Sequence, residues 1–144
     1  MNYDEYRKAY FTGPLPELRY CFTGAFGVTL FFGDFDSAVA YYQQVLGPPA
    51  YAEGKGTNGW QIGIGWLTLL QGKSGNPINV EVTLQVETPI EAERLQKAFI
   101  EAGGKGLDPS DEYMYVPIRS CSVRDPFGTE ILIVSPLVGE RKQK

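Results

Sequence analysis

The chain has 144 residues, of which 43% are hydrophobic and 21% are charged, and its net charge is −4 at pH 7. These values are typical of one globular domain and exclude a disordered chain. No apolar run approaches the ~20 residues of a membrane-spanning helix, and no basic stripe is present that could neutralise nucleic-acid phosphates. With a polar start in place of a signal segment, the sequence predicts a cytoplasmic protein with no membrane or nucleic-acid partner.

The sequence contains no histidine and two cysteines, Cys21 and Cys121. Without histidine the chain lacks the commonest general base and the commonest transition-metal ligand, which excludes Ser-His-Asp and Cys-His catalysis. A zinc site would have to be built from Cys, Asp and Glu alone. Two cysteines are too few for a disulfide framework, so we expect two small buried thiols.

Regular elements are predicted from residue 28 onward, after an N-terminal segment with a short helix at 3–10. Residues 28–32 are rich in β-branched and aromatic side chains, which favours a strand. Asp34 or Asp36 offers an N-cap to a helix over 37–46, where the apolar positions have helical spacing. The sequence Gly-Pro-Pro ends that helix. Short strands are then expected over three ranges: 50–53, 60–65 and 66–71.

The same order of elements restarts after a linker at 72–77. Residues 79–86 alternate polar and apolar side chains, as a strand with one buried face does. A proline in the first turn begins a helix over 90–102, which a Gly-Gly pair ends. Further strands are expected over three ranges: 114–115, 118–123 and 130–134. The pattern therefore predicts an α+β chain in which strand-helix-strand-strand-strand occurs twice.

Three segments carry a family resemblance. Residues 31–47 read FFGDFDSAVAYYQQVLG, residues 91–95 read EAERL before an Ala-Gly-Gly, and residues 124–129 read RDPFGT. In this order and spacing they resemble the first strand and helix, the second helix and the Asp-Pro-x-Gly turn of one superfamily. It is the glyoxalase / bleomycin-resistance / dioxygenase superfamily, also called vicinal oxygen chelate proteins.

The resemblance implies two βαβββ modules that form a curled mixed sheet around a cleft, and a homodimer. The single domain would then span residues 26–138, with modules at about 26–75 and 76–138. An N-terminal extension, 1–25, and a polar tail, 139–144, would flank it.

Many members of the superfamily hold a divalent metal in the cleft. Carried across one at a time, the ligand positions fall on Gly27, Glu81 and Leu132, and near Leu69 or Leu70. Only Glu81 can bind an ion, whereas a catalytic site normally takes three protein ligands or more. We therefore predict no metal site of the family type and no cofactor.

Strand alternation extends these positions to a predicted site. If Glu81 and Leu132 face the cleft, then Thr83, Gln85 and Glu130 face it too, although the same alternation is found on an ordinary solvent-exposed sheet. Arg119 is expected to pair with Glu81 or Glu130. For each aromatic residue of the predicted site, ordinary packing in the core is the alternative to ligand binding. The predicted ligand-binding residues are Thr29, Phe31, Trp60, Thr83, Gln85, Tyr113, Tyr115, Arg119 and Leu132.

Two functions remain open from the sequence. One is a protein that binds a small molecule without a metal, as drug-sequestering members of the superfamily do in an acidic, aromatic-lined groove, which would favour a cationic planar ligand. The other is an enzyme of the lyase, isomerase or dioxygenase kind with Glu81 or Glu130 as its catalytic general base, desolvated by Leu132 and Phe31. A third possibility is an atypical metal site that combines Glu81, Glu130 and Cys121.

Overall fold

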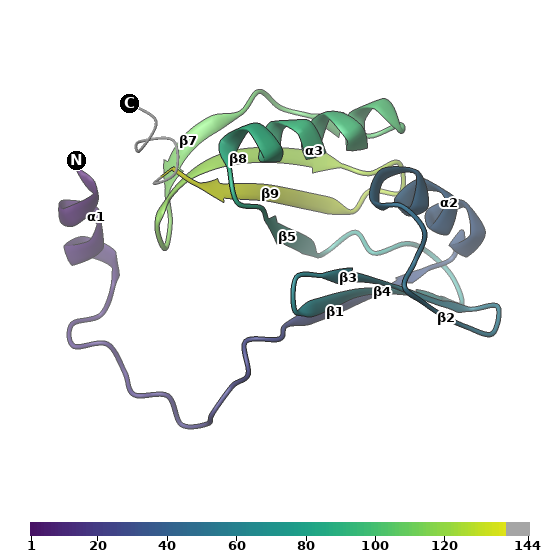
Figure 1. Cartoon of the computed structure of the whole chain (residues 1–144), viewed down its shortest axis with the longest axis horizontal. Coiled ribbons are helices and arrows are strands. Elements are labelled where there is room, and N and C mark those ends of the chain that lie inside the picture. Colours follow the sequence, from purple (N-terminus) through teal and green to yellow (C-terminus); the bar gives the residue numbers. More distant parts are fainter. Residues whose placement is uncertain (138–144) are drawn as a thin grey trace.

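The computed structural model describes residues 1–137. A short N-terminal helix is followed by a βαβββ module and by a second module of the same order with one additional two-residue strand (Figure 1). The helix is α1 (Tyr3–Tyr10), as predicted. The first module comprises β1 (Gly27–Phe32), α2 (Phe35–Leu46), β2 (Tyr51–Glu53), β3 (Thr57–Ile62) and β4 (Gly65–Gln71). The second comprises β5 (Glu81–Gln85), α3 (Pro89–Glu101), β6 (Lys105–Gly106), β7 (Ser110–Tyr113), β8 (Pro117–Arg124) and β9 (Glu130–Pro136). The predicted polar tail, 139–144, lies outside the described residues.

The repeat of element order is confirmed, with two strands displaced from their predicted positions. The strand expected at 60–65 is β3, which ends earlier because Gly63 has a positive φ of 57° and turns the chain into β4. The strand expected at 114–115 is β7, which ends at Tyr113. Met114 instead donates its backbone N–H to the carbonyl of Val116 in the turn before β8.

The strands form two mixed sheets, one in each module. Sheet A has the order β1-β4-β3-β2, and sheet B has the order β5-β9-β8-β6 with β7 also paired to β8. In each sheet the first strand runs parallel to the last, with Gly27 beside Trp66 and Glu81 beside Glu130. Among the described strands β1 and β5 each have one partner, so both are edge strands.

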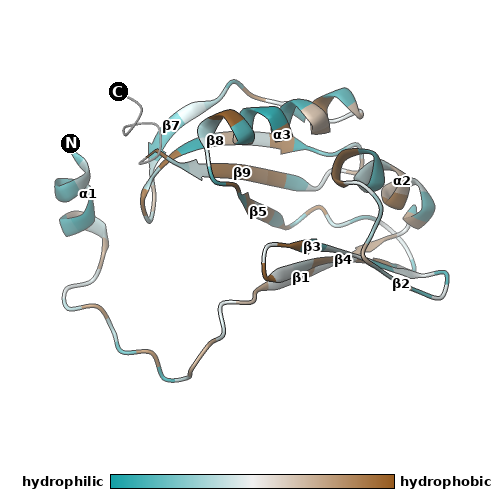
Figure 2. Cartoon of the chain, in the orientation of Figure 1, coloured by the Kyte–Doolittle hydropathy of each residue, from teal (hydrophilic) through white to brown (hydrophobic). Residues whose placement is uncertain are grey.

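Alternation along the central strands separates a helix-covered face from an open face. In β5, Val82 and Leu84 are buried while Glu81, Thr83 and Gln85 are exposed, as the sequence predicted. In β9, Ile131 and Ile133 are buried, and the next residue, Val134, is buried as well. Apolar residues concentrate on β9 and on α2 and α3 (Figure 2). No helix in the described part of the chain is both long and apolar enough to cross a membrane.

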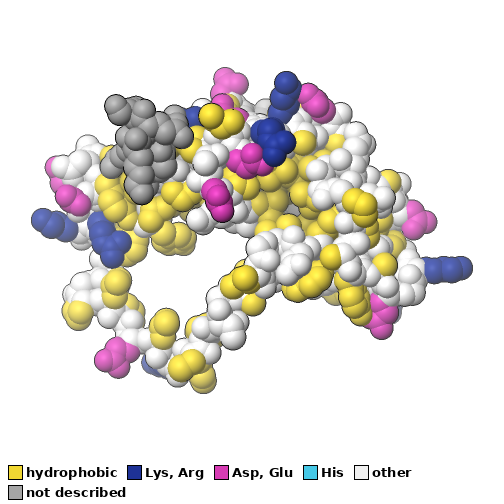
Figure 3. Space-filling view, in the orientation of Figure 1, with side chains coloured by type: hydrophobic (Ala, Val, Ile, Leu, Met, Phe, Trp, Pro, Cys, Tyr) yellow, Lys and Arg dark blue, Asp and Glu magenta, His cyan; other side chains and the backbone are white. Residues whose placement is uncertain are grey.

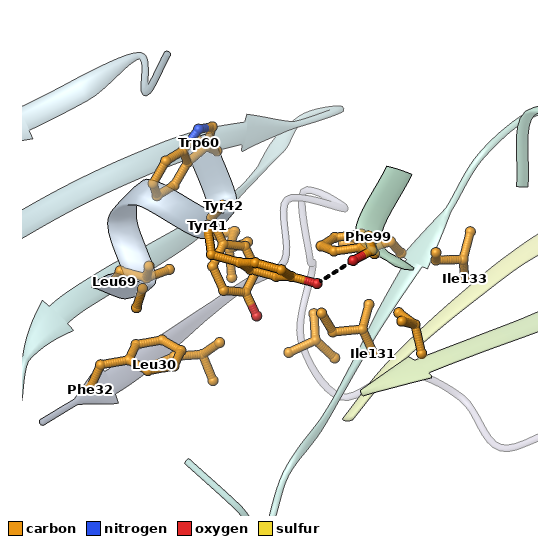
Figure 4. Packing of buried hydrophobic residues seen from close by; sticks show 14 of the residues in the cluster. Leu30, Phe32, Tyr41, Tyr42, Trp60, Leu69, Phe99, Ile131 and Ile133 are labelled. Carbon is orange, nitrogen blue, oxygen red and sulfur yellow. Dashed lines mark hydrogen bonds between the residues drawn. The ribbon is translucent and has the colours of Figure 1, made fainter. Parts of the chain in front are cut away.

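An aromatic core joins the two modules through their helices. The rings of Tyr41 and Tyr42 on α2 each lie 6.1 Å from that of Phe99 on α3, between centroids. Tyr41 Oη donates a 2.7 Å hydrogen bond to the carbonyl of Phe99 (Figure 4). This approach requires glycine at position 104, where a Cβ atom would lie 2.7 Å from Tyr41 Oη. The helices α2 and α3 therefore pack closely through the contact of Tyr41 and Tyr42 with Phe99.

A buried carboxylate completes this junction. Asp125, in the turn before β9, is only 3% exposed and accepts a 2.8 Å hydrogen bond from Tyr42 Oη. Its other oxygen accepts from the backbone N–H groups of Phe127 and Thr129 at 2.9 and 2.8 Å. Burial raises the pKa of Asp125 above its usual range, although these hydrogen bonds oppose the shift.

Asp125→Asn should change how stability depends on pH. Because the native pKa is raised, the stability that Asp125 supplies is fully present below its unfolded pKa, about 3.9, and is lost as pH rises through the native pKa. The near-isosteric Asn does not titrate. Urea unfolding should show the variant gaining stability relative to the natural protein across that window. A difference independent of pH would contradict the buried-carboxylate account.

Candidate functional site

A groove of about 310 Å³ lies between the facing edges of β1 and β5. We call it the seam groove, because each module supplies one wall. The first module contributes Phe26, Gly27, Val28, Ile62, Trp66 and Leu67. The second contributes Val80, Glu81, Val82, Thr83 and Leu84. A second hollow of about 300 Å³ continues between β1 and the segment that precedes β5, and Val80 lines both hollows.

The lining of the seam groove is apolar apart from two side chains of β5. Glu81 is its one charged side chain among the described residues, and Thr83 adds a hydroxyl. Trp66, 40% exposed, and Phe26 supply aromatic surface. Backbone N–H and C=O groups on the outer edges of β1 and β5 have no strand partner there in the described structure and are able to bond a ligand. This arrangement suits a flat apolar body that carries a cation or hydrogen-bonding groups.

The predicted cleft residues are divided among neighbouring surfaces. Glu81 and Thr83 line the seam groove, whereas Thr29 and Phe31 line the hollow beside it. Leu132 lies next to Thr83 in the register of sheet B, and Gln85 follows on the same open face. Glu81 is exposed, so the desolvation expected from Leu132 and Phe31 is not found.

The second predicted carboxylate is held in an ion pair. Glu130 sits beside Glu81 in the parallel register, but its Oε1 accepts from Arg124 Nε at 2.7 Å and lies 2.6 Å from an Arg124 terminal nitrogen. Both side chains line a different, shallow hollow of about 290 Å³. Among the described residues no side chain forms a hydrogen bond or ion pair with Glu81. Glu81 can therefore contact a ligand, whereas Glu130 is already paired with Arg124.

Four predicted residues lie away from the groove. Trp60 is 3% exposed in the helix-covered core, where its Nε1 donates to the carbonyl of Gly47 at 2.8 Å. Tyr113 and Tyr115 contact α1 at the far end of sheet B. The expected pairing of Arg119 with Glu81 or Glu130 is wrong. It lies on the helix-covered face and pairs with Asp111 and with Glu93 of α3.

The positions carried over for metal ligands do not assemble a cation site. Gly27 and Glu81 share the seam groove, but Leu69 is buried in the core of sheet A. Cys121 is buried on the helix-covered face, which raises the pKa of its thiol, so the proposed set of Glu81, Glu130 and Cys121 is split between opposite faces. No three His, Cys, Asp or Glu residues come together within residues 1–137. Cys21, expected to be buried, is exposed.

The predicted ligand-binding residues did not include Trp66 and Phe26, which form the aromatic wall of the groove. Trp66 alternates with the buried Leu67 and therefore faces the open side of β4, a signal present in the pattern. Its ring lies over Gly59 of β3, where a Cβ atom would lie 3.4 Å from the indole. Phe26 precedes β1 and carried no usable signal, because its position depends on how the segment before β1 meets the domain.

Comparison with known proteins identifies the fold. No protein-family model matches the sequence, and no curated protein matches it at a significant level. Solved structures do. A glyoxalase/bleomycin resistance protein from Catenulispora acidiphila is 22% identical with a TM-score of 0.60, covering 77% of this chain and 96% of that one. A lactoylglutathione lyase from Agrobacterium tumefaciens is 14% identical with a TM-score of 0.62, covering 80% and 95%.

An integron cassette protein from Vibrio cholerae is similar at 17% identity, with a TM-score of 0.63 and coverage of 82% of this chain and 98% of that one. The chain therefore has the glyoxalase/bleomycin-resistance fold, and the resemblance inferred from its motifs is confirmed at that level. Nearly all of each neighbour matches, but only about four fifths of this chain does, so this chain carries additional residues.

The two tryptophans should report separately on the groove and the core. Trp66→Phe leaves the buried Trp60, so the remaining fluorescence should be blue-shifted and resist acrylamide quenching. In dilute protein, where the open face of sheet A is uncovered, Trp60→Phe leaves Trp66, whose emission should be redder and quenched severalfold more strongly. Equal quenching of both variants would contradict the placement of the two rings.

Proposed function

We propose that the protein binds a small, flat, cationic molecule in the seam groove without a bound metal. The observation that carries the proposal is the lining of the groove, in which Glu81 is the one carboxylate among largely apolar residues that include the Trp66 indole. Low-polarity walls reduce the screening of a charge, and an aromatic face attracts a cation as well as stacking on a planar ring. The two features favour the same class of ligand.

The donor set supports binding without a metal. Of the side chains that line the groove, Glu81 and Thr83 alone offer oxygen atoms, and none offers an imidazole or a thiolate. Protein sites for zinc use three or four ligands and sites for calcium use six or more. A cation held by one carboxylate and one hydroxyl would keep most of its water, so the organic ligand has to supply the positive charge.

A second candidate function is general-base catalysis by Glu81 in the same groove. It is favoured by one contrast: Glu130 is engaged by Arg124, whereas no described side chain pairs with Glu81. A carboxylate that is free to accept a proton, next to a bound substrate, is the minimum requirement for an isomerase or lyase of this kind. Its test is turnover of any ligand that the groove is found to bind, which Glu81→Gln should abolish.

The proposal includes a homodimer in the cytoplasm. The open face of sheet A exposes Phe31, Tyr51 and Trp66, which lie on alternate positions of β1, β2 and β4. Single exposed apolar residues are normal on monomers, but a group of large ones on one sheet face is typical of an interface. A second copy of the chain supplies a surface that covers it.

Titration with aminoacridine, a planar cation, tests the proposed ligand class. We expect binding that quenches Trp66, and no comparable binding of the anionic anthracene carboxylate. Glu81→Gln should weaken aminoacridine binding by roughly two- to fivefold, the range for an exposed charge pair, and more where the bound ring excludes water. Glu101→Gln on the outer side of α3 is the matched control and should leave affinity unchanged.

Metal dependence is measured in the same titration. Protein treated with a chelator and protein supplemented with Mn²⁺ or Zn²⁺ should give the same dissociation constant for aminoacridine. Tighter binding of the anion than of the cation would contradict the proposed ligand. Stoichiometric retention of a divalent ion whose removal abolishes binding would contradict the metal-free site.

A further inference from the structure

An arm formed by residues 12–26 joins α1 to β1 and stands away from the rest of the molecule. It contains no helix or strand, and its residues are exposed throughout. Figure 3 shows an open space between this arm and the body of the domain. The arm therefore runs through solvent between two attached ends.

Both ends of the arm are fixed to the same chain. At one end the tyrosines of α1 contact the turn between β7 and β8. Tyr3 Oη donates to the carbonyl of Tyr115, Tyr6 Oη donates to that of Tyr113 at 3.2 Å, and the rings of Tyr6 and Tyr113 lie 5.2 Å apart. At the other end the arm continues directly into β1 of sheet A. Because α1 sits at the far end of sheet B, the arm spans the molecule as an arch (Figure 1).

The arm has the side-chain pattern of a strand with one apolar face. Leu18, Tyr20 and Phe22 are 80%, 72% and 74% exposed, and Arg19 and Cys21 alternate with them. The segment bends at residues 19 and 20, but the rings of Tyr20 and Phe22 lie 6.4 Å apart, and an extended conformation would place all these alternate residues on one side. An aromatic side chain buries roughly 150–250 Å² when it is covered, so leaving this face in water forgoes a large hydrophobic contribution.

A second apolar surface lies uncovered on sheet A. Phe31, Tyr51 and Trp66 project from its open face, and Ile64 from the turn beside them, all at least 40% exposed. The same chain thus leaves two separate apolar surfaces in solvent, one shaped as a strand and one as a sheet face. A strand-like segment laid on an apolar sheet face would cover both surfaces.

We propose that the arm of one copy packs across the open face of sheet A in a second copy, reciprocally, in a two-fold symmetric dimer. In such a dimer the arm of each copy lies on sheet A of the other copy. Both apolar surfaces of both copies are then covered, and each contact occurs twice. Specific interfaces bury about 800 Å² per partner. The arm's aromatic residues together with those of the sheet face are enough to reach that size. This contact goes beyond the proposed homodimer, which needs only the sheet faces. Its test requires no ligand, although Trp66 belongs both to this face and to the seam groove.

The test compares a triple variant with a matched control. Leu18→Ser, Tyr20→Ser and Phe22→Ser are combined in one chain, and Arg19→Ser is the control on the opposite side of the arm. The triple variant should fold normally, because its residues are outside the core, as far-ultraviolet circular dichroism and thermal unfolding at low concentration will show. Sedimentation velocity should give a dimer for the natural chain and the control, and a dissociation constant at least about a hundredfold weaker for the triple variant.

A second measurement distinguishes contact between copies from contact within one chain. Cys21 is the exposed cysteine of the described chain and Cys121 is buried, so a bimane fluorophore attaches to the arm. A labelled chain that carries Trp66→Phe is mixed with unlabelled natural protein, whose Trp66 is then the quencher on the partner's sheet. We expect quenching that grows with added natural protein and disappears when the added protein also carries Trp66→Phe.

Three outcomes would overturn the proposal. A natural chain that is monomeric at high concentration would remove the dimer altogether. A dimer unaffected by the triple substitution would leave dimerisation through the sheets intact but exclude the arm. Quenching in the labelled natural chain alone, with none between mixed chains, would show that the arm folds back on its own sheet.

Discussion

The packing of α2 against the second module is the constraint on which the rest of the structure depends. Sheets A and B share no hydrogen-bonded strands in the described chain, so helix contacts and the turn before β9 set how the sheets face each other. Tyr41 reaches the carbonyl of Phe99, and Tyr42 reaches Asp125. Both bonds are buried, where a lost partner costs about 1–3 kcal/mol. The junction therefore holds the edges of β1 and β5 on opposite sides of the seam groove.

This junction explains why the groove has its particular chemistry. The helix-covered faces use the large apolar side chains of both modules, which leaves the outward positions of β5 to polar residues. Glu81 and Thr83 lie at those positions, while Val82 and Leu84 between them anchor the strand in the core. Sheet A contributes the opposite character, because Trp66 and Phe31 project from its open face. The groove thus combines one carboxylate on the edge strand β5 with aromatic surface from β4 and from the residue before β1.

Much of the fold could be predicted from the sequence, because it depends on local pattern. The spacing of apolar residues and the caps located α2 and α3, and alternation gave the buried face of β5. The site could be predicted only in part. Glu81 and Thr83 were placed correctly along their strand, but whether a strand position reaches the groove depends on how the two sheets meet. That angle is set by contacts between residues distant in the chain, such as Tyr42 with Asp125.

The failures have the same physical origin. Arg119 was expected to pair with Glu81 or Glu130. Its side chain lies instead on the helix-covered face of β8, where it pairs with Asp111 and Glu93. Tyr113 and Tyr115 were expected in a cleft because they lie near a loop, whereas α1 occupies their surface. No local sequence pattern predicts the partners of these residues, because each partner belongs to a segment that is distant in the chain and packs there only in the folded protein.

Mapping of backbone amide resonances during titration with aminoacridine tests the central claim most directly. The account predicts that the perturbed amides cluster on two facing edges, at Gly27 and Val28 of β1 and at Glu81 to Thr83 of β5. A larger hollow of about 410 Å³, lined by Tyr6, Tyr10, Met114 and Tyr115, lies between α1 and sheet B and serves as the internal comparison. Perturbation confined to that hollow, or to neither place, would contradict the assignment of the seam groove as the binding site.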